Sequence, residues 1–152
     1  LAITAGCVAL RSLAMSDNQV SGVGLVAACA QCPSLTALEL RQCAEEMTEG
    51  EVQAVSDALP CLTRLVLEGH TRVTGRAVEH LLARRVPLQH LSLARCLAAA
   101  DSSSAISLSS ASASAGLRAL LTLDLSYSPQ LDDACVQLLG QRCSQLRELN
   151  VM

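Results

Sequence analysis

Cysteine and histidine hold most of the reactive chemistry available to this sequence, which has eight of the first and three of the second. Cys29 and Cys32 form a C-x-x-C pair, a spacing found in zinc and redox sites. A zinc site needs about four ligands, and no second pair follows at a zinc-like spacing. Both cysteines also suit the end of a helix that packs into a core. We therefore interpret the pair as structural.

A second group, formed by Cys43, His70 and Cys96, occupies equivalent positions in successive segments. If these segments are neighbouring parallel strands, the three side chains lie about 5 Å apart in one column, which suggests a thiol–imidazole or metal site. A nucleophile also needs an orienting acid and an oxyanion site, and neither is recognisable. We favour the alternative that this column bonds to backbone groups of a turn.

Other signatures of catalysis are absent from the sequence. It contains no Gly-rich phosphate loop, no H-E-x-x-H and no G-x-S-x-G. We therefore expect no enzyme activity, no catalytic residues, no cofactor and no metal.

The elements that position these residues belong to an internal repeat. Each copy begins with L-x-x-L-x-L, with Met15 and Val151 in place of the last leucine in the first and sixth copies, and the copies are spaced by 25 to 32 residues. The alternation that closes the motif predicts a strand with one buried face. The first leucines are Leu10, Leu35, Leu62, Leu88, Leu120 and Leu146, which predicts strands near 12–16, 37–41, 64–68, 90–94, 122–126 and 148–151.

The second half of each unit predicts a helix. Ser21, Thr48, Thr74 and Asp132 are good N-cap residues, and Glu51 follows Thr48 at capping-box spacing. We expect helices near 22–31, 49–58, 75–84 and 133–143. Strand and helix therefore alternate along the chain.

Cysteines recur before the leucine motif, as in Cys7-Val-Ala-Leu10, Cys32-Pro-Ser-Leu35 and Cys143-Ser-Gln-Leu146. With the strand motif and its period, they make the chain resemble leucine-rich repeats, specifically the cysteine-containing subtype of F-box/LRR proteins. The resemblance implies an α/β, right-handed solenoid with parallel strands on the concave side and helices on the convex side. We expect one domain of about five to six units over 1–152, in a fragment of a longer protein.

One unit departs from the repeat, because its spacing of 32 residues is about six longer than usual. The extra length falls in the Ser- and Ala-rich stretch 98–116, which predicts either an inserted loop or a poorly packed helix capped by Asp101. We favour the loop, since loops tolerate added residues at little cost.

Composition excludes several functional classes. A net charge of −3 and no Trp or Phe disfavour nucleic acid, and no apolar run approaches the roughly 20 residues of a membrane span. The cysteines follow the repeat and read as buried free thiols. We therefore expect an intracellular protein of a reducing compartment such as cytoplasm, nucleus or cilium, not a secreted one.

Binding residues are expected on the concave face, where variable strand positions point to solvent. Arg41, Arg64 and Tyr127 are the first hot-spot candidates because Arg and Tyr are enriched at such positions. The simplest role for Arg41 and Glu68 is to pair with each other across adjacent strands. The candidate partner-binding residues are Glu39, Arg41, Arg64, Glu68, His90, Asp124 and Tyr127.

These observations predict a non-catalytic scaffold that binds other proteins within a larger complex. The resemblance implies, more specifically, the substrate-recognition module of a ubiquitin ligase. One alternative is a structural subunit of a large assembly, such as a ciliary axoneme or an organellar complex. Another is an enzyme regulator like ribonuclease inhibitor or Ran GTPase-activating repeats, although their units of about 28–29 residues are longer.

Overall fold

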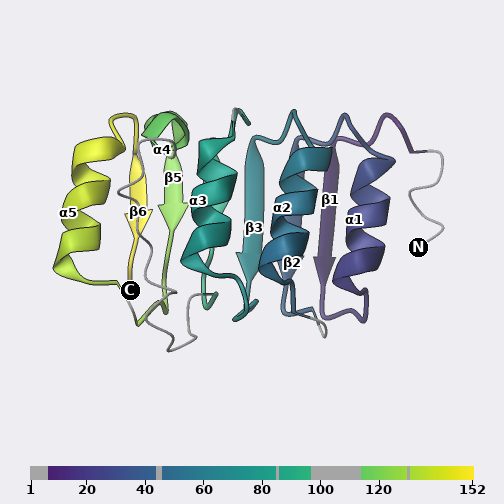
Figure 1. Cartoon of the computed structure of the whole chain (residues 1–152), viewed down its shortest axis with the longest axis horizontal. Coiled ribbons are helices and arrows are strands. Elements are labelled where there is room, and N and C mark those ends of the chain that lie inside the picture. Colours follow the sequence, from purple (N-terminus) through teal and green to yellow (C-terminus); the bar gives the residue numbers. More distant parts are fainter. Residues whose placement is uncertain (1–6, 44–45, 85, 97–113, 130) are drawn as a thin grey trace.

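Strands and helices alternate through the computed structural model, which describes residues 7–43, 46–84, 86–96, 114–129 and 131–152 (Figure 1). In these residues the strands form one parallel sheet in chain order. The strands are β1 Ser12–Ser16, β2 Ala37–Arg41, β3 Arg64–Glu68, β4 His90–Ser92, β5 Thr122–Asp124 and β6 Glu148–Asn150. The helices are α1 Gly22–Ala30, α2 Glu49–Ala58, α3 Gly75–Ala83, α4 Ser114–Ala119 and α5 Asp133–Arg142. The α/β solenoid fold expected from the repeat is confirmed.

The sheet register explains why the leucine motif recurs. Equivalent leucines pair directly across each strand boundary, as Leu38 does with Leu65 and Leu65 with Leu91. They therefore stack on one face of the sheet, where Leu38, Leu65, Leu91 and Leu123 are all at most 4% exposed. Each repeat thus completes the core of the next, because no single strand could bury its leucines alone.

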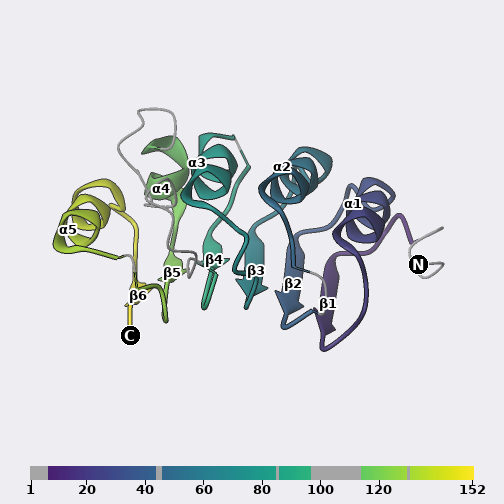
Figure 2. The ribbon, with the colours of Figure 1, turned by 60° about the horizontal axis from the view of Figure 1, so that its bottom comes forward.

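All the helices lie over that leucine face and leave the opposite face uncovered (Figure 2). Their starts follow the predicted caps: Ser21, Thr74 and Asp132 accept hydrogen bonds from backbone N–H groups in the first turns of their helices. The Glu51 carboxylate accepts from the backbone N–H of Thr48 at 2.7 Å and from its hydroxyl at 2.9 Å. Capping therefore fixes where the chain turns from sheet to helix.

Several elements are shorter than the sequence predicts. β4 and β5 each end two residues early, before the turns in which Arg95 and Tyr127 adopt a left-handed backbone with φ of 59° and 57°. Hydrogen bonding continues past the strands, since the Leu93 N–H still donates to the Asp124 carbonyl. β6, α1, α3 and α5 each end one residue early. In the three helices, the residue expected last is the C-cap.

The predicted insertion covers residues 98–116, of which residues 98–113 lie outside the described part of the chain. Its last residues open α4, a short helix that packs closely on α3. Gly116 sits against the backbone of Leu82, with no room for a Cβ atom.

All eight cysteines are free, consistent with a reducing compartment. Within the described residues, no helix combines the length and the hydrophobicity that a membrane span requires.

Candidate protein-binding face

The uncovered face of the sheet brings together most of the predicted binding residues. On β2 and β3, Glu39, Arg41, Arg64 and Glu68 alternate with the buried leucines and are all half-buried. On β4 and β5, His90 and Asp124 occupy the same face and are also half-buried. We call this surface, formed by the variable positions of β1 to β6, the open face.

Charged residues of β2 and β3 neutralise one another. The Arg41 guanidinium lies 2.8 Å from the Glu68 carboxylate and 3.3 Å from that of Glu39. Glu39 also accepts from Arg64 at 2.7 Å. The hydrogen bond from Arg64 is the main cause that lowers the pKa of Glu39, and the bond to Glu68 raises that of Arg41. The predicted Arg41–Glu68 pair is confirmed, and each of these arginines has a carboxylate partner.

The burial of Val66 shows that solvent has little access to the surface between the charged side chains of β2 and β3. It alternates with Leu65 and Leu67, so the sequence pattern directs it to solvent, yet it is only 2% exposed. Its register neighbour Glu39 takes part in the ion-pair network with Arg64. The expectation of a solvent-facing Val66 is wrong, because the long charged side chains around it cover a small apolar one.

The open face changes character at β4 and β5. The His90 ring nitrogen Nδ1 lies 2.9 Å from the Thr122 hydroxyl. Asp124 accepts from the backbone N–H of Ser126 at 2.9 Å and from the Ser92 hydroxyl at 3.5 Å. These side chains are short, and no arginine in the described residues pairs with Asp124. The predicted residues His90 and Asp124 therefore belong to a separate, weakly charged patch.

Next to this patch lies a row of residues in the turns that follow the strands. Asp17, Gln42, Gly69, Arg95 and Tyr127 all have positive φ, between 48° and 78°. The N–H of each donates to a carbonyl in the following repeat, as Arg95 does to Ser126 at 3.0 Å. We call these five residues the turn row. Their backbones are fixed by the solenoid itself, so their side chains start from defined positions.

Two members of the turn row contact each other. Tyr127 is 63% exposed, and the guanidinium of Arg95 lies 4.7 Å from the centre of its ring. Arg95 is not among the residues predicted from the sequence, although Tyr127, which occupies the equivalent position of the next repeat, is one of them. The available signal was its place two residues after Leu93, which repeats in every unit.

The side chains of Cys43, His70 and Cys96 form hydrogen bonds with backbone groups. The Cys96 thiol donates to the Leu67 carbonyl at 2.7 Å, and burial raises its pKa to about 12. His70 Nδ1 accepts from the Met47 N–H at 3.1 Å. Burial raises the pKa of Cys43 and lowers that of His70, so both stay uncharged near neutral pH. The column therefore binds backbone groups of the turns, which is the alternative that the sequence favours.

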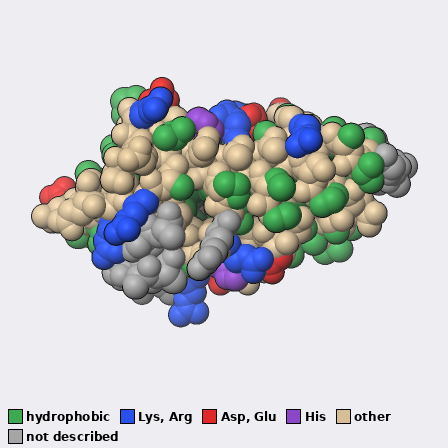
Figure 3. All heavy atoms as spheres, turned by 90° about the horizontal axis from the view of Figure 1, so that it is seen from above, with side chains coloured by type: hydrophobic (Ala, Val, Ile, Leu, Met, Phe, Trp, Pro, Cys, Tyr) green, Lys and Arg blue, Asp and Glu red, His purple; other side chains and the backbone are tan. Residues whose placement is uncertain are grey.

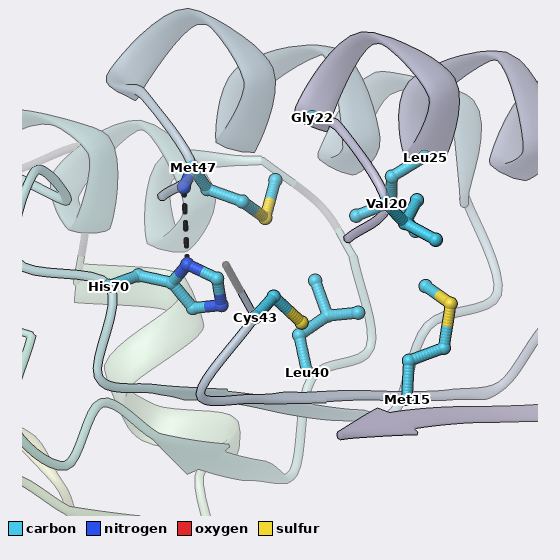
Figure 4. A pocket seen from close by; sticks show the side chains of 8 residues that line it. All are labelled: Met15, Val20, Gly22, Leu25, Leu40, Cys43, Met47 and His70. Atoms are coloured by element: carbon cyan, nitrogen blue, oxygen red, sulfur yellow. Dashed lines mark hydrogen bonds between the residues drawn. The ribbon is translucent and has the colours of Figure 1, made fainter. Parts of the chain in front are cut away.

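A small cavity of about 10 Å³ lies beside this column (Figure 4). Cys43, Met15 and Met47 contribute sulfur atoms to its wall, and His70 Nε2 is buried without a protein partner. Because Nδ1 accepts a hydrogen bond, Nε2 must carry the proton in the neutral ring and cannot bind a metal through a lone pair.

The C-x-x-C pair lies in the core. Cys29 and Cys32 are each 1% exposed, and the thiol of Cys32 donates to the Cys7 carbonyl at 3.7 Å. Burial, with a smaller contribution from Cys32, raises the pKa of Cys29 to about 11. Among the described residues, no cluster of three His, Cys, Asp or Glu side chains could hold a metal ion.

The edge of the solenoid opposite the turn row contains the turns from helix to strand. Exposed Pro33, Pro60, Cys61 and Pro87 lie in these turns. Figure 3 looks onto this edge and shows hydrophobic side chains scattered between Arg side chains that form no continuous stripe.

A family model described as Leucine Rich repeat matches residues 6–27, which include β1 and most of α1. No curated protein sequence matches the chain. The match agrees with the six parallel strands and their alternating helices. Leucine-rich repeats generally act as protein-interaction modules that use an extended concave surface.

Proposed function

We propose that this chain is a non-catalytic protein-interaction module that binds its partner on the open face and the adjoining turn row. The observation that supports this most directly is the asymmetry of the sheet. One face carries the same leucine in every repeat, whereas the other carries a different side chain at almost every position. Identical residues serve stacking, and the varied surface is free to be specific for a partner.

The absence of catalysis is part of this proposal. The cysteines of the column and of the C-x-x-C pair are buried or half-buried, and the raised pKa values of Cys29, Cys43 and Cys96 disfavour thiolates. His70 uses one ring nitrogen to bind the backbone. These groups therefore support the fold and leave no nucleophile–base pair for chemistry.

More specifically, we propose substrate recognition for a ubiquitin ligase of the F-box/LRR kind. Support comes from the cysteines at Cys7, Cys32 and Cys143 and from the backbone-binding column that includes Cys96. These are the features of the sequence that resemble the cysteine-containing repeats of that family. The comparisons supply no evidence for an F-box, so a ligase core would have to be engaged outside the matched segment.

A structural role in a large assembly is the second candidate. The patch on β4 and β5 has only short side chains, and the charges on β2 and β3 are internally paired. A face of this kind suits a structural subunit that neighbouring subunits cover permanently as well as it suits a recognition surface. The enzyme-regulator alternative has no comparable support, since it needs longer alternating units.

Affinity purification of the full-length protein, with matched variants, tests these proposals. Ser92→Arg places a bulky side chain in the middle of the open face, and Gln137→Arg makes the same change on exposed α5. We expect Ser92→Arg, but not Gln137→Arg, to lose the partners captured by the unmodified protein. Cullin adaptors among the captured proteins support the ligase proposal, and stable subunits of a filament or organelle complex support the brace.

Equal losses in both variants would contradict binding on the open face, as would unchanged capture by Ser92→Arg. Thermal melts of the purified variants show whether each one still folds. If Ser92→Arg does not fold, Ala14→Arg on the exposed part of β1 replaces it.

A further inference from the structure

The turn row contains an anomaly that its structural role does not explain. Positive φ is the conformation that glycine adopts at little cost and that bulky side chains resist. Gly69 follows this rule, whereas the equivalent positions hold Asp17 and Gln42 in the repeats before it and the two largest side chains, Arg95 and Tyr127, in the repeats after it. Both backbone N–H groups make the same type of bond as that of Gly69, so the turn itself gains nothing from the larger side chains.

The two side chains are held together. The Arg95 guanidinium stacks on the Tyr127 ring at 4.7 Å, the range of a cation–π contact. Each N–H is tied to the following repeat, at 3.0 Å for Arg95 and 2.8 Å for Tyr127. A backbone fixed by hydrogen bonds and a mutual ring contact limit the conformations of both side chains before any partner arrives. Preorganised Arg and Tyr side chains are the residues most often found at binding hot spots.

Charge distinguishes this pair from the other arginines of the sheet. Arg41 and Arg64 each have a carboxylate within 3.3 Å. Arg95 has none at ion-pairing distance in the part of the chain that the structure describes, and its side chain is exposed. The nearest acidic residue of the patch, Asp124, is bonded to Ser126 and Ser92. No described residue of the chain therefore neutralises the charge of Arg95, which can pair with a partner.

We propose that Arg95 and Tyr127 form a docking site for an acidic segment of a partner protein. A carboxylate of that segment pairs with the guanidinium in the plane that the tyrosine ring leaves free, and the exposed ring packs against the neighbouring part of the segment. The short side chains of Ser92 and Thr122 leave the adjoining open face without an obstacle to an extended chain. This inference rests on the proposed interaction function and names the chemistry of the partner.

The protein supplies its own reporter for a test. Tyr127 is the only tyrosine, and the chain has no tryptophan or phenylalanine, so its intrinsic fluorescence comes from this site. The probe is a hexaglutamate peptide blocked at both ends, and hexalysine is its matched control. We expect hexaglutamate to change the tyrosine fluorescence saturably, with an affinity that weakens as salt increases, and hexalysine to have no effect.

Arg95→Gly is the decisive variant. Glycine relieves the unfavourable φ, so this variant should melt at the same temperature as the parent or above it, while its affinity for hexaglutamate falls at least tenfold. Arg147→Gly removes an exposed arginine at the opposite edge of the sheet. Arg147→Gln is the alternative if glycine at that position weakens β6. Either control should bind hexaglutamate within twofold of the parent.

Equal affinity of Arg95→Gly and the parent would overturn the proposal, and so would equal responses to hexaglutamate and hexalysine. A parent that does not bind hexaglutamate also overturns it. In that case the interaction function stands if Ser92→Arg still loses the captured partners, and it falls with the docking site if capture is unchanged.

Discussion

The two halves of the open face have the same scaffold and different surfaces. On β2 and β3, four charged side chains form a network that satisfies itself and covers Val66. On β4 and β5 the side chains are short and polar, and the adjoining turns expose Arg95 and Tyr127. The leucines beneath both halves are equally buried. The repeat therefore specifies only one side of each strand, and the other side can differ from unit to unit without cost to the core.

The largest expected effect tests whether the two halves depend on the core equally. Leu65→Asp on β3 and Leu123→Asp on β5 each place an unpaired charge in the leucine stack, where the parent side chains are at most 4% exposed. The cost of several kcal/mol is comparable with the stability of about 5–15 kcal/mol of a typical domain. We expect neither variant to unfold cooperatively in a thermal melt followed by circular dichroism.

Val23→Asp is the control, since Val23 is 73% exposed on α1. It should melt within a few degrees of the parent. If Leu123→Asp melted cooperatively and Leu65→Asp did not, the solenoid would consist of two independent halves and the shared-core comparison would fail.

A smaller effect is expected at Gly116, where α4 packs closely against α3. Gly116→Ala pushes a Cβ atom into the backbone of Leu82, so α4 must move away from α3. Overpacking of this kind typically costs about 1–3 kcal/mol. We expect Gly116→Ala to lower the free energy of unfolding by that amount in urea titrations.

Gly140→Ala in α5 is the matched control. Nothing lies within 4 Å of the new Cβ atom, and alanine is the better helix former. This variant should gain up to about 1 kcal/mol. A loss of similar size in both variants would contradict the α3–α4 contact as the cause, because Gly140→Ala meets no such contact and its helix propensity predicts a gain.

The sequence predicts the solenoid core because its leucines return at a nearly fixed interval, and the N-caps at Ser21, Thr48, Thr74 and Asp132 mark each helix start. It also predicts the Arg41–Glu68 pair, since adjacent parallel strands in register bring these positions together. Of the docking pair, the sequence predicts Tyr127 as a binding candidate but not Arg95. Arg95 lies in a turn, where the side-chain direction follows from φ, and no periodicity of leucines reveals φ.

The burial of Val66 was missed for a related reason. Alternation along a strand states which face a side chain occupies, but not whether longer neighbours from the next strand close over it.

In the first half, His70 makes the free energy of unfolding depend on pH. No histidine occupies the equivalent positions of the second half. Burial lowers the pKa of His70, partly offset by Glu46, so the unfolded chain takes up a proton near pH 6.5 while the folded chain does not. Stability from this residue is therefore complete above about pH 6.5 and declines as the pH falls toward the lowered pKa. Urea titrations should give a lower free energy of unfolding at pH 5 than at pH 7.5.

His70→Asn should remove most of that difference, because Asn18 occupies the equivalent position in the first repeat and accepts from the Val20 N–H. His80 and His90 are unchanged in this variant. An unchanged pH dependence in His70→Asn would assign the effect to those two residues or to the carboxylates.

The smallest expected effect tests whether the ion pairs on β2 and β3 contribute to the free energy of unfolding. A double-mutant cycle of Arg41→Gln and Glu68→Gln should give a coupling energy of about 0.2–1 kcal/mol, because both side chains are partly exposed. The same cycle on Arg84 and Asp57, which lie 2.8 Å apart on the helix side, supplies a reference for exposed pairs. The coupling should shrink in 1 M salt, measured by urea titration.

A coupling of zero would remove the contrast between the halves, since Arg41 would then be as available to an acidic partner as Arg95. Arg41→Gln should in that case weaken hexaglutamate binding as strongly as Arg95→Gly does, whereas the paired state predicts no change.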